Sequence, residues 1–92
     1  MFDPLIHQPL RTQIISLLVK NELMSFKMFK EALDVTDGNL STHIKKLVEA
    51  EYISEEKFFE DKKPKTIYKI TPLGVKQFQI YVKQLKELIN AT

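Results

Sequence analysis

The stretch SFKMFKEALDVTDGNLSTHIKKLVEA, residues 25–50, holds two amphipathic segments separated by about three residues. Ser25 is a good N-cap for a first helix over Phe26–Leu33, in which apolar residues recur at helical spacing. A tight turn, DVT, follows that helix. Thr36 or Asp37 then caps a second helix that runs to the end of the stretch. Two helices joined by so short a connection predict a helix-turn-helix over about residues 26–50.

The second helix of this motif has one apolar and one polar face when its residues are placed about 100° apart. Its apolar arc is made of Leu40, Ile44, Leu47 and Val48. A helix in the major groove of DNA presents its N-terminal residues to the base edges, where asparagine suits adenine and serine or threonine is tolerant. Lysines one turn later can contact guanine or phosphate. The candidate DNA-binding residues are Asn39, Ser41, Thr42, Lys45 and Lys46. An ordinary solvated helix face is the competing interpretation.

The residues around the motif predict the order helix–helix–helix–strand–strand–helix. A helix over about Pro9–Lys20 precedes it, and NELMS is a short connector. Ile15 and Val19 widen the apolar stripe of this first helix. After the motif, the period of apolar residues changes from about 3.6 to 2, which predicts strands over Tyr52–Phe59 and Lys65–Thr71. We therefore expect a mostly α fold with a small β-hairpin, an α+β winged helix-turn-helix.

The two predicted strands enclose a basic connection. It reads DKKPKT and places Lys62, Lys63 and Lys65 on a turn stiffened by Pro64. Such a tip is attracted to phosphate groups by counterion release, whatever the DNA sequence. We interpret these lysines as DNA-binding residues of a wing over about residues 52–71. A hairpin tip that only improves solubility is the alternative.

The last predicted helix begins at Pro72, capped by Thr71, and ends near residue 90. Its apolar residues are spaced three and four apart, as in a heptad seam: Val75, Phe78, Val82, Leu85 and Ile89. We expect residues 72–90 to be a long dimerisation helix that forms a two-fold interface together with Ile15 of the first helix. Packing on its own domain is the alternative. A dimer would set two recognition helices about 34 Å apart, so the expected operator is an inverted repeat.

The composition fits one globular domain over residues 1–92. Hydrophobic residues make up 43% of the chain and charged residues 28%, and the absence of cysteine excludes disulfides and thiol chemistry. No apolar run reaches the roughly 20 residues of a membrane span, and the N-terminus lacks the features of a signal peptide. We therefore expect a cytoplasmic protein with no membrane partner. A net charge of +2 is weak evidence for a nucleic-acid partner, so the placement of the lysines matters more than their number.

Nothing in the sequence predicts an enzyme. There is no Gly-rich phosphate loop, no nucleophile–base spacing and no carboxylate pair in a plausible pocket. His7 and His43 are far apart in the sequence, so we expect neither a metal site nor a cofactor. His43 lies on the flank of the buried arc, where a packed, hydrogen-bonded histidine is the expected role.

Three motifs occur in order along the chain. They are R-x-x-I-I-x-L-L at residues 11–18, GNLSTHIKKL at 38–47 and P-x-T-x-Y-x-I-T-x-x-G at 64–74. Over roughly Asp3 to Ile89 the chain resembles the small winged-helix regulators related to the MarR and ArsR families. The resemblance implies a dimeric DNA-binding transcriptional regulator with double-stranded DNA as its partner. The same fold also serves protein–protein interaction modules that do not bind DNA, which stays the alternative.

Two positions depart from the family pattern. Glu51 stands where the family often has glycine, so Glu51 must adopt a left-handed conformation at some cost, or the chain must leave the helix differently. The wing has no arginine, the residue best suited to a narrow minor groove, so we expect it to contact phosphate instead. A small-molecule effector would have room only at the dimer interface, between the first and last helices.

Overall fold

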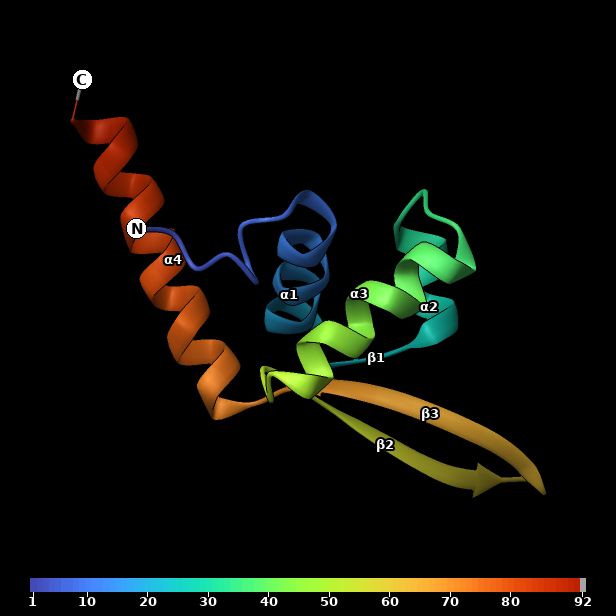
Figure 1. Cartoon of the computed structure of the whole chain (residues 1–92). Helices are drawn as coiled ribbons and strands as arrows, with labels where there is room; N and C mark the ends of the chain where they lie inside the picture. Colours follow the sequence, from blue (N-terminus) through green and yellow to red (C-terminus); the bar gives the residue numbers. More distant parts are fainter. Residues whose placement is uncertain (92) are drawn as a thin grey trace.

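The computed structural model describes residues 1–91, and within that range it contains four helices and a three-stranded sheet (Figure 1). In chain order the elements are α1 (Pro9–Asn21), β1 (Leu23–Ser25), α2 (Phe26–Ala32), α3 (Asp37–Glu49), β2 (Ile53–Glu60), β3 (Lys63–Ile70) and α4 (Pro72–Asn90). This architecture confirms the expected α+β winged helix-turn-helix. The predicted helix ends lie within a residue or so of the observed ones.

The strand β1 is the element that the sequence analysis missed. Leu23–Ser25, expected to be part of a connector, pair antiparallel with β3, which therefore lies between β1 and β2. Met24 lies opposite Tyr68 and is only 3% exposed. Three residues are too few to display an alternating pattern, and the partner strand is far along the chain. The strand joins the α1–α2 connection to the base of the hairpin.

Three side chains cap helices: Ser25 and Thr71 as predicted, and Thr36 of the two candidates Thr36 and Asp37. The hydroxyl oxygens of Ser25, Thr36 and Thr71 each accept the backbone N–H of the residue three positions on, at the starts of α2, α3 and α4. Each bond satisfies one of the donors that a first helical turn leaves without a partner. At the start of α1 the side chain of Gln8 does the same for the N–H of Arg11.

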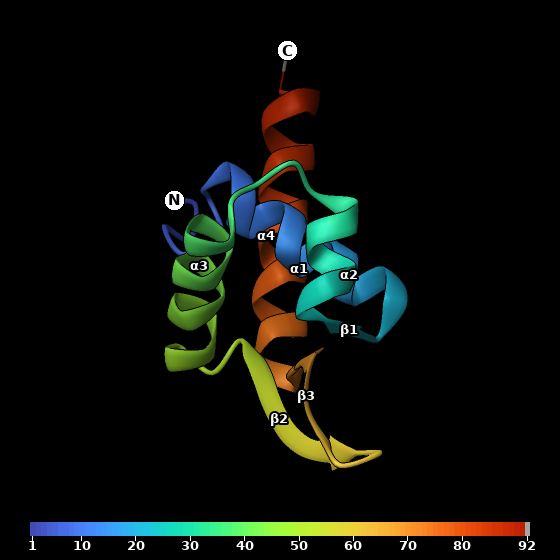
Figure 2. The same cartoon turned by 90° about the vertical axis from the view of Figure 1, so that its right-hand side faces the viewer.

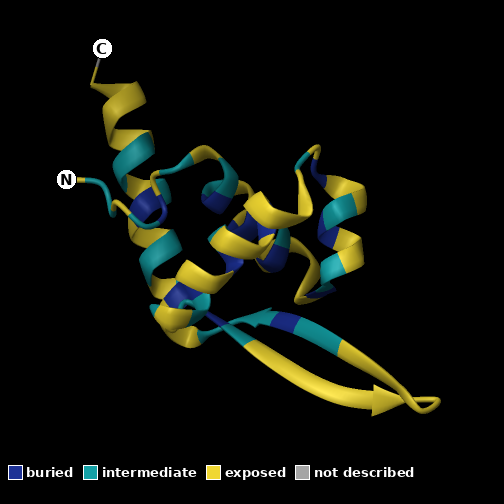
Figure 3. Cartoon of the chain, turned by 45° about the vertical axis from the view of Figure 1, so that its right-hand side comes forward, coloured by how far each residue is buried: buried dark blue, intermediate teal, exposed yellow. Residues whose placement is uncertain are grey.

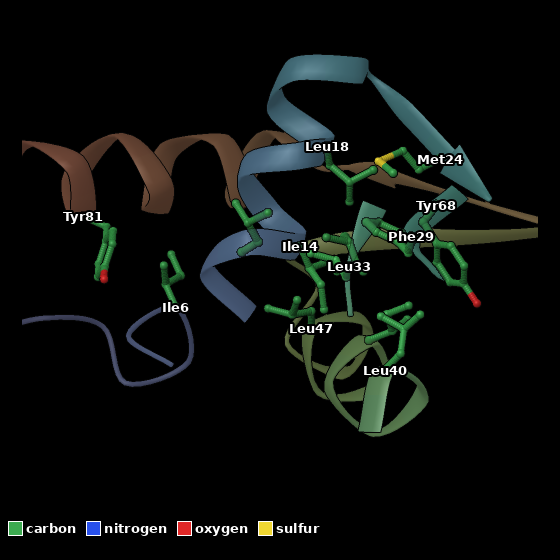
Figure 4. Packing of buried hydrophobic residues seen from close by; sticks show 13 residues of the cluster. Ile6, Ile14, Leu18, Met24, Phe29, Leu33, Leu40, Leu47, Tyr68 and Tyr81 are labelled. Atoms are coloured by element: carbon green, nitrogen blue, oxygen red, sulfur yellow. The ribbon is translucent and has the colours of Figure 1, made fainter. Parts of the chain in front are cut away.

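The hydrophobic core lies where α1, α2 and α3 meet the inner face of the sheet (Figure 4). Its largest fully buried side chains are Ile6, Ile14, Ile15, Leu18, Phe29, Leu40, Leu47 and Ile53. The rings of Phe29 in α2 and Tyr68 in β3 have centroids 6.1 Å apart. Because α3 and the hairpin both contribute to this core, their relative positions are fixed by packing.

Aromatic side chains of α4 contact aromatic side chains of the N-terminal segment that precedes α1. Tyr81 of α4 is 5% exposed, and its hydroxyl lies 3.0 Å from Nδ1 of His7. The ring of His7 stacks on that of Phe2, with centroids 4.7 Å apart. The side chain of Gln84 donates to the carbonyl of Met1. Beyond these contacts the C-terminal half of α4 projects away from the other elements (Figures 1 and 2).

Ile15 of α1 lies in the hydrophobic core of the domain. The prediction that Ile15 belongs to a dimer interface is therefore wrong. Its side chain is fully buried within the chain and offers no surface to a partner. Val19, one turn later in the same predicted stripe, is 47% exposed. The part of α1 that stays exposed beside α4 is therefore the C-terminal end of α1.

A two-residue turn joins β2 and β3. Its residues, Asp61 and Lys62, have φ angles of 52° and 64°. Positive φ at both positions is the geometry of a type I′ turn, whose twist matches that of the flanking strands. Pro64, which we expected in this turn, instead lies in β3 opposite Phe59. The expectation that Pro64 stiffens the turn is therefore wrong.

The chain leaves α3 through Glu51, which has a φ of 63°. The N–H of Glu51 donates to the carbonyl of Val48, and the N–H of Tyr52 donates to the carbonyl of Leu47. These are the two hydrogen bonds of a Schellman motif, in which the left-handed residue is usually glycine. Of the two exits considered from the sequence, the chain takes the left-handed one and bears its conformational cost.

Candidate nucleic-acid interface

The polar face of α3 is open to solvent, while Leu40, Ile44 and Leu47 turn its other face into the core. Figure 3 shows exposed residues along α3 and again along β2 to the hairpin turn. All five candidate residues of this helix are exposed: Asn39, Ser41, Thr42, Lys45 and Lys46. The structure therefore brings them together on one accessible face, next to Gly38. An added Cβ at Gly38 would meet nothing within 4 Å, so the helix backbone there is bare.

Lys30 of α2 holds the start of α3. Its Nζ lies 3.0 Å from a carboxylate oxygen of Asp37 and also donates to the carbonyl of Val35 in the turn. The Asp37 carboxylate is thus compensated by a cation, and it also lies in the first helical turn, where a negative charge is favourable. No local sequence signal predicts this contact, because Lys30 also fits an ordinary exposed helix position.

Arg11 of α1 supports α3 from behind. This arginine is only 9% exposed, and its Nε donates to the carbonyl of Leu5 over 2.6 Å. Its Nη1 lies 2.8 Å from Nδ1 of His43 in α3. Burial, together with the charges of Arg11 and Lys46, lowers the pKa of the His43 imidazole. His43 therefore has the packed, hydrogen-bonded role expected from the sequence. The sequence analysis did not identify Arg11 as a supporting residue. Its position three residues before the buried Ile14 places it on the same, core-facing side of α1.

A groove separates α3 from the inner face of the hairpin. Ser41, Lys45 and Glu49 line it from α3, and Glu55 and Tyr68 line it from the strands. Burial and the neighbouring Glu55 carboxylate raise the pKa of Tyr68 to about 12, so its hydroxyl stays protonated. Lys45 and Glu49 approach to 4.0 Å as an exposed i,i+4 pair, which contributes little to stability. This groove identifies the face of the hairpin that looks toward the recognition surface.

Within the described residues, the ion pairs of the hairpin lie away from its tip, where Glu60 and Asp61 adjoin the lysines. Near its base Lys57 lies 3.7 Å from Glu55, and Lys69 lies 3.4 Å from Glu56. Four candidate lysines form no ion pair within the part of the chain that the structure describes: Lys46, Lys62, Lys63 and Lys65. Their charges are therefore available to a partner, and three of them lie at or beside the hairpin tip.

The three wing lysines do not all lie as the sequence suggested. Lys62 is in the turn, whereas Lys63 and Lys65 belong to β3. Successive strand residues point to opposite faces, and Tyr68 points toward α3. Lys63 and Lys65 therefore lie on the outer face of the hairpin, away from the groove. If these two lysines contact DNA phosphates, the outer face of the wing makes that contact.

The seam of α4 remains partly open. Val75, Phe78, Val82 and Leu85 are half-buried, and Ile89 is 70% exposed. Phe78 and Val82 line an apolar groove with Val19 of α1, and Lys83 and Lys86 lie at its rim. This groove and the exposed Ile89 are accessible parts of the predicted dimer surface.

Two further features concern residues 1–91 alone. None of their helices is both long and apolar enough to cross a membrane. No three of their His, Asp or Glu side chains gather closely enough to hold a metal ion.

A family model described as a winged helix DNA-binding domain matches residues 10–89. An uncharacterized protein of Methanocaldococcus jannaschii is 38% identical over 78 residues, which is 85% of each chain. The residues matched by the family model include nearly all of the helices and strands described above.

Solved structures resemble the fold closely. A transcriptional regulator homologue of Pyrococcus horikoshii has a TM-score of 0.88 at 28% identity, covering 95% of this chain and 86% of that one. A regulator of the MarR family from Enterococcus faecalis has a TM-score of 0.81 at 18% identity, covering 95% and 77%. The second likeness concerns the fold alone. The family model and the first likeness agree with the resemblance drawn from the three sequence motifs.

Proposed function

The chain belongs to the winged helix DNA-binding domain family, and from that premise we propose that residues 1–92 act as a homodimeric, sequence-specific transcriptional regulator of an inverted-repeat operator. The observation that carries the proposal is the exposed face of α3, on which short polar side chains precede two lysines. Among the residues that the structure describes, the lysines at the tip of the neighbouring hairpin form no ion pair. One helix for base edges and one basic hairpin for phosphates are the two elements that such a protein needs.

In this proposal α3 lies in the major groove. Asn39 can pair with the edge of an adenine, and Ser41 and Thr42 can approach bases closely because their side chains are short. Lys45 and Lys46, one turn later, contact guanine or phosphate. Gly38 supports a close approach of the duplex, because no side chain covers the backbone there.

The wing binds the phosphate backbone. Lys62 at the turn, with Lys63 and Lys65 along the outer face of β3, supplies sequence-independent attraction. Lysine suits this role because it acts as a compact point charge on a flexible stem. The carboxylates nearest the hairpin base are already paired with Lys57 and Lys69, so they oppose the phosphates less.

The dimer forms through α4. Its seam leaves Phe78 and Val82 partly exposed beside Val19, and covering this apolar groove with a second copy would remove it from water. A domain of 92 residues has a small core, so the additional burial would also help its stability. Two-fold symmetry then places two α3 helices in successive major grooves.

Selection of genomic DNA fragments with the purified protein, followed by titration of the selected duplex at several salt concentrations, tests the proposal. We expect an inverted-repeat site and an affinity that falls steeply as salt rises. Lys63→Ala should weaken binding to every sequence and lower the salt dependence by about one ion, whereas Asn39→Ala should change the sequence preference.

Two outcomes would contradict this assignment. A folded protein with no affinity for any selected duplex at low salt would reject DNA binding and favour a protein–protein interaction module. If Lys63→Ala and Asn39→Ala changed affinity and sequence preference alike, the division between backbone and base contacts would be wrong.

A further inference from the structure

The segment that precedes α1, residues 1–7, contacts both α4 and the exit from α3. We propose that this segment, here called the strap, fixes the direction of α4 relative to α3 and so sets the half-site spacing that the dimer accepts. The inference rests on the proposed function, in which α4 joins two copies and each α3 reads one half-site. It gives positioning roles to Asp3, His7, Tyr52 and Tyr81.

The helix α4 has its first attachment at its start. The hydroxyl of Thr71 lies 2.6 Å from the carbonyl oxygen of Glu51 and 3.1 Å from that of Tyr52, and the N–H of Thr71 also donates to Tyr52. At Gly74 the backbone comes so close that an added Cβ would lie 2.1 Å from the Tyr52 carbonyl oxygen. Residues 71–74 therefore form a pivot on the exit from α3. An attachment at one end of a helix fixes its position there but not its direction.

The strap supplies a second attachment in the middle of α4. Tyr81 is 5% exposed, and its hydroxyl lies 3.0 Å from Nδ1 of His7. The ring of Phe2 stacks on His7 and lies 5.6 Å from the ring of Tyr81, measured between centroids. One turn further on, the side chain of Gln84 donates to the carbonyl of Met1 over 3.0 Å. Figure 1 shows the strap as the blue trace between α4 and the start of α1.

The strap is itself held to the domain that carries α3. The hydroxyl of Tyr52, at the exit from α3, donates to the carboxylate of Asp3 over 2.5 Å. Burial, with the hydrogen bond and charge of Asp3, raises the pKa of Tyr52 to about 12, so this hydroxyl stays a donor. The other carboxylate oxygen of Asp3 accepts the N–H of Leu5, whose carbonyl accepts from Arg11. Ile6 is fully buried in the core, so the strap is a packed part of the domain.

The direct contact between α1 and α4 leaves room for movement. An apolar groove lies between the C-terminal end of α1, at Val19, and the side of α4 that carries Phe78 and Val82. Because this groove is open, no close packing there stops α4 from tilting toward α1. The aromatic contacts of Tyr81 and the hydrogen bond of Asp3 oppose such a tilt, since α4 cannot move away from the domain without breaking one of them.

A small tilt of α4 has a large effect on the spacing of two α3 helices. Tyr81 lies ten residues beyond the pivot residue Thr71, or about 15 Å along the helix, so a tilt of about 10° displaces it by about 2.6 Å. In a two-fold dimer both copies tilt, and the two α3 helices move by about 5 Å, more than the roughly 3.4 Å between base pairs. A fixed direction of α4 is therefore needed for a dimer that accepts one spacing.

The first test varies the DNA. The duplex selected from genomic DNA is compared with duplexes that have one base pair more or one less between the half-sites. We expect the wild type to bind the altered duplexes about a hundredfold more weakly, because the gain from two linked sites is lost. The double variant Tyr52→Phe, Tyr81→Phe removes two hydroxyls and keeps both rings. It should lose only about tenfold, with an unchanged affinity for a single half-site.

The matched control is Ile14→Val, which lowers stability by removing one buried methyl group and leaves the strap intact. It should keep the hundredfold loss of the wild type on the altered duplexes. A general loss of stability would weaken binding to every duplex alike, whereas a loosened α4 changes the dependence on spacing.

The second test needs no DNA. The chain has no cysteine, so spin labels attached through Lys46→Cys and Ile80→Cys report only the distance between α3 and α4. Both positions are exposed. Labelled chains are diluted into an excess of unlabelled protein, so that the distance within one chain is measured. We expect a narrow distance distribution in the wild-type and Ile14→Val backgrounds and a broader one when the hydroxyls of Tyr52 and Tyr81 are removed.

The outcomes separate the two proposals. If the wild type binds DNA but the double tyrosine variant keeps either its dependence on spacing or its narrow distribution, the strap proposal is overturned while the proposed function stands. Equal effects of Ile14→Val would overturn it too, because a loss of stability would then explain both. If the wild type binds no duplex at low salt, the proposed function fails and the role in half-site spacing fails with it. The distance distributions then decide whether the strap fixes α4.

Discussion

The guanidinium of Arg11 donates from Nη1 to Nδ1 of His43 over 2.8 Å, and this contact joins α1 to the middle of α3. An arginine has no acceptor atom, so Nδ1 must accept and the imidazole must be neutral. Protonation would set a second positive charge beside that of the buried Arg11. The contact therefore makes the stability of the helix-turn-helix depend on pH.

We predict that stability falls as pH drops below the usual histidine pKa of 6.5. Burial and Arg11 lower the pKa of His43 in the folded chain, so the unfolded chain takes up the proton first. The stabilisation is complete above pH 6.5 and is lost as pH falls through the lowered pKa. Denaturant midpoints measured between about pH 7 and about pH 5.5 should show this decline.

The control for this prediction is His43→Asn. An asparagine keeps an acceptor for Arg11 and carries no charge at any pH. Its midpoint should depend less on pH than that of the wild type over the same interval. An equal dependence in both proteins would assign the effect to other groups.

Replacement of the left-handed residue after α3 should stabilise the protein. Glu51 has a φ of 63°, which costs an L-residue about 1 kcal/mol relative to glycine. We therefore expect Glu51→Gly to raise the free energy of unfolding by about that amount. Glu51→Ala is the control, because alanine has the same conformational cost and should bring no comparable gain. Chemical denaturation of the three proteins decides the matter.

The two glycines should respond oppositely to alanine. At Gly74 an added Cβ would lie 2.1 Å from the carbonyl oxygen of Tyr52, where α4 begins against the exit from α3. Gly74→Ala should therefore destabilise the protein by about 1–3 kcal/mol or displace α4. Gly38→Ala, with open space around its Cβ, should be at least as stable as the wild type. Equal melting temperatures of the two variants would show that the close approach at Gly74 does not affect stability.

The features that the sequence predicted well are local ones. Ser25, Thr36 and Thr71 could be recognised as caps because an N-cap bond spans only three residues. The polar face of α3 followed from helical periodicity alone. The sequence pointed to Glu51 as the unusual position but left two exits from α3 open, and only the structure shows that the left-handed one is taken.

The features that the sequence did not predict depend on contacts between distant residues. Met24 becomes part of a strand only because β3 passes beside it. Arg11 is buried because the carbonyl of Leu5 and the ring of His43 happen to surround it. Ile15 shared an apolar stripe with Val19, and only the packed structure shows that one is buried and the other exposed.

An acidic residue in the seam of α4 should separate the proposed dimer. Val82 is half-buried and lines the apolar groove with Val19 and Phe78. Covering this groove with a partner would bury a new carboxylate, which is unfavourable without a cation or hydrogen-bond donors. We therefore expect Val82→Glu to be a monomer in sedimentation velocity at concentrations where the wild type is a dimer. Its affinity for an inverted repeat should fall toward that for a single half-site, because the gain from two linked sites is lost.

The matched control is Ile80→Glu, an equal change on the opposite side of the same helix. Ile80 is 42% exposed, and at about 3.6 residues per turn it points away from the seam. This variant should keep the dimer and its affinity for the inverted repeat. Circular dichroism should show both variants folded, which separates loss of the interface from loss of the fold. A wild-type protein that sediments as a monomer, or dissociation by both variants alike, would show that α4 does not form the proposed interface.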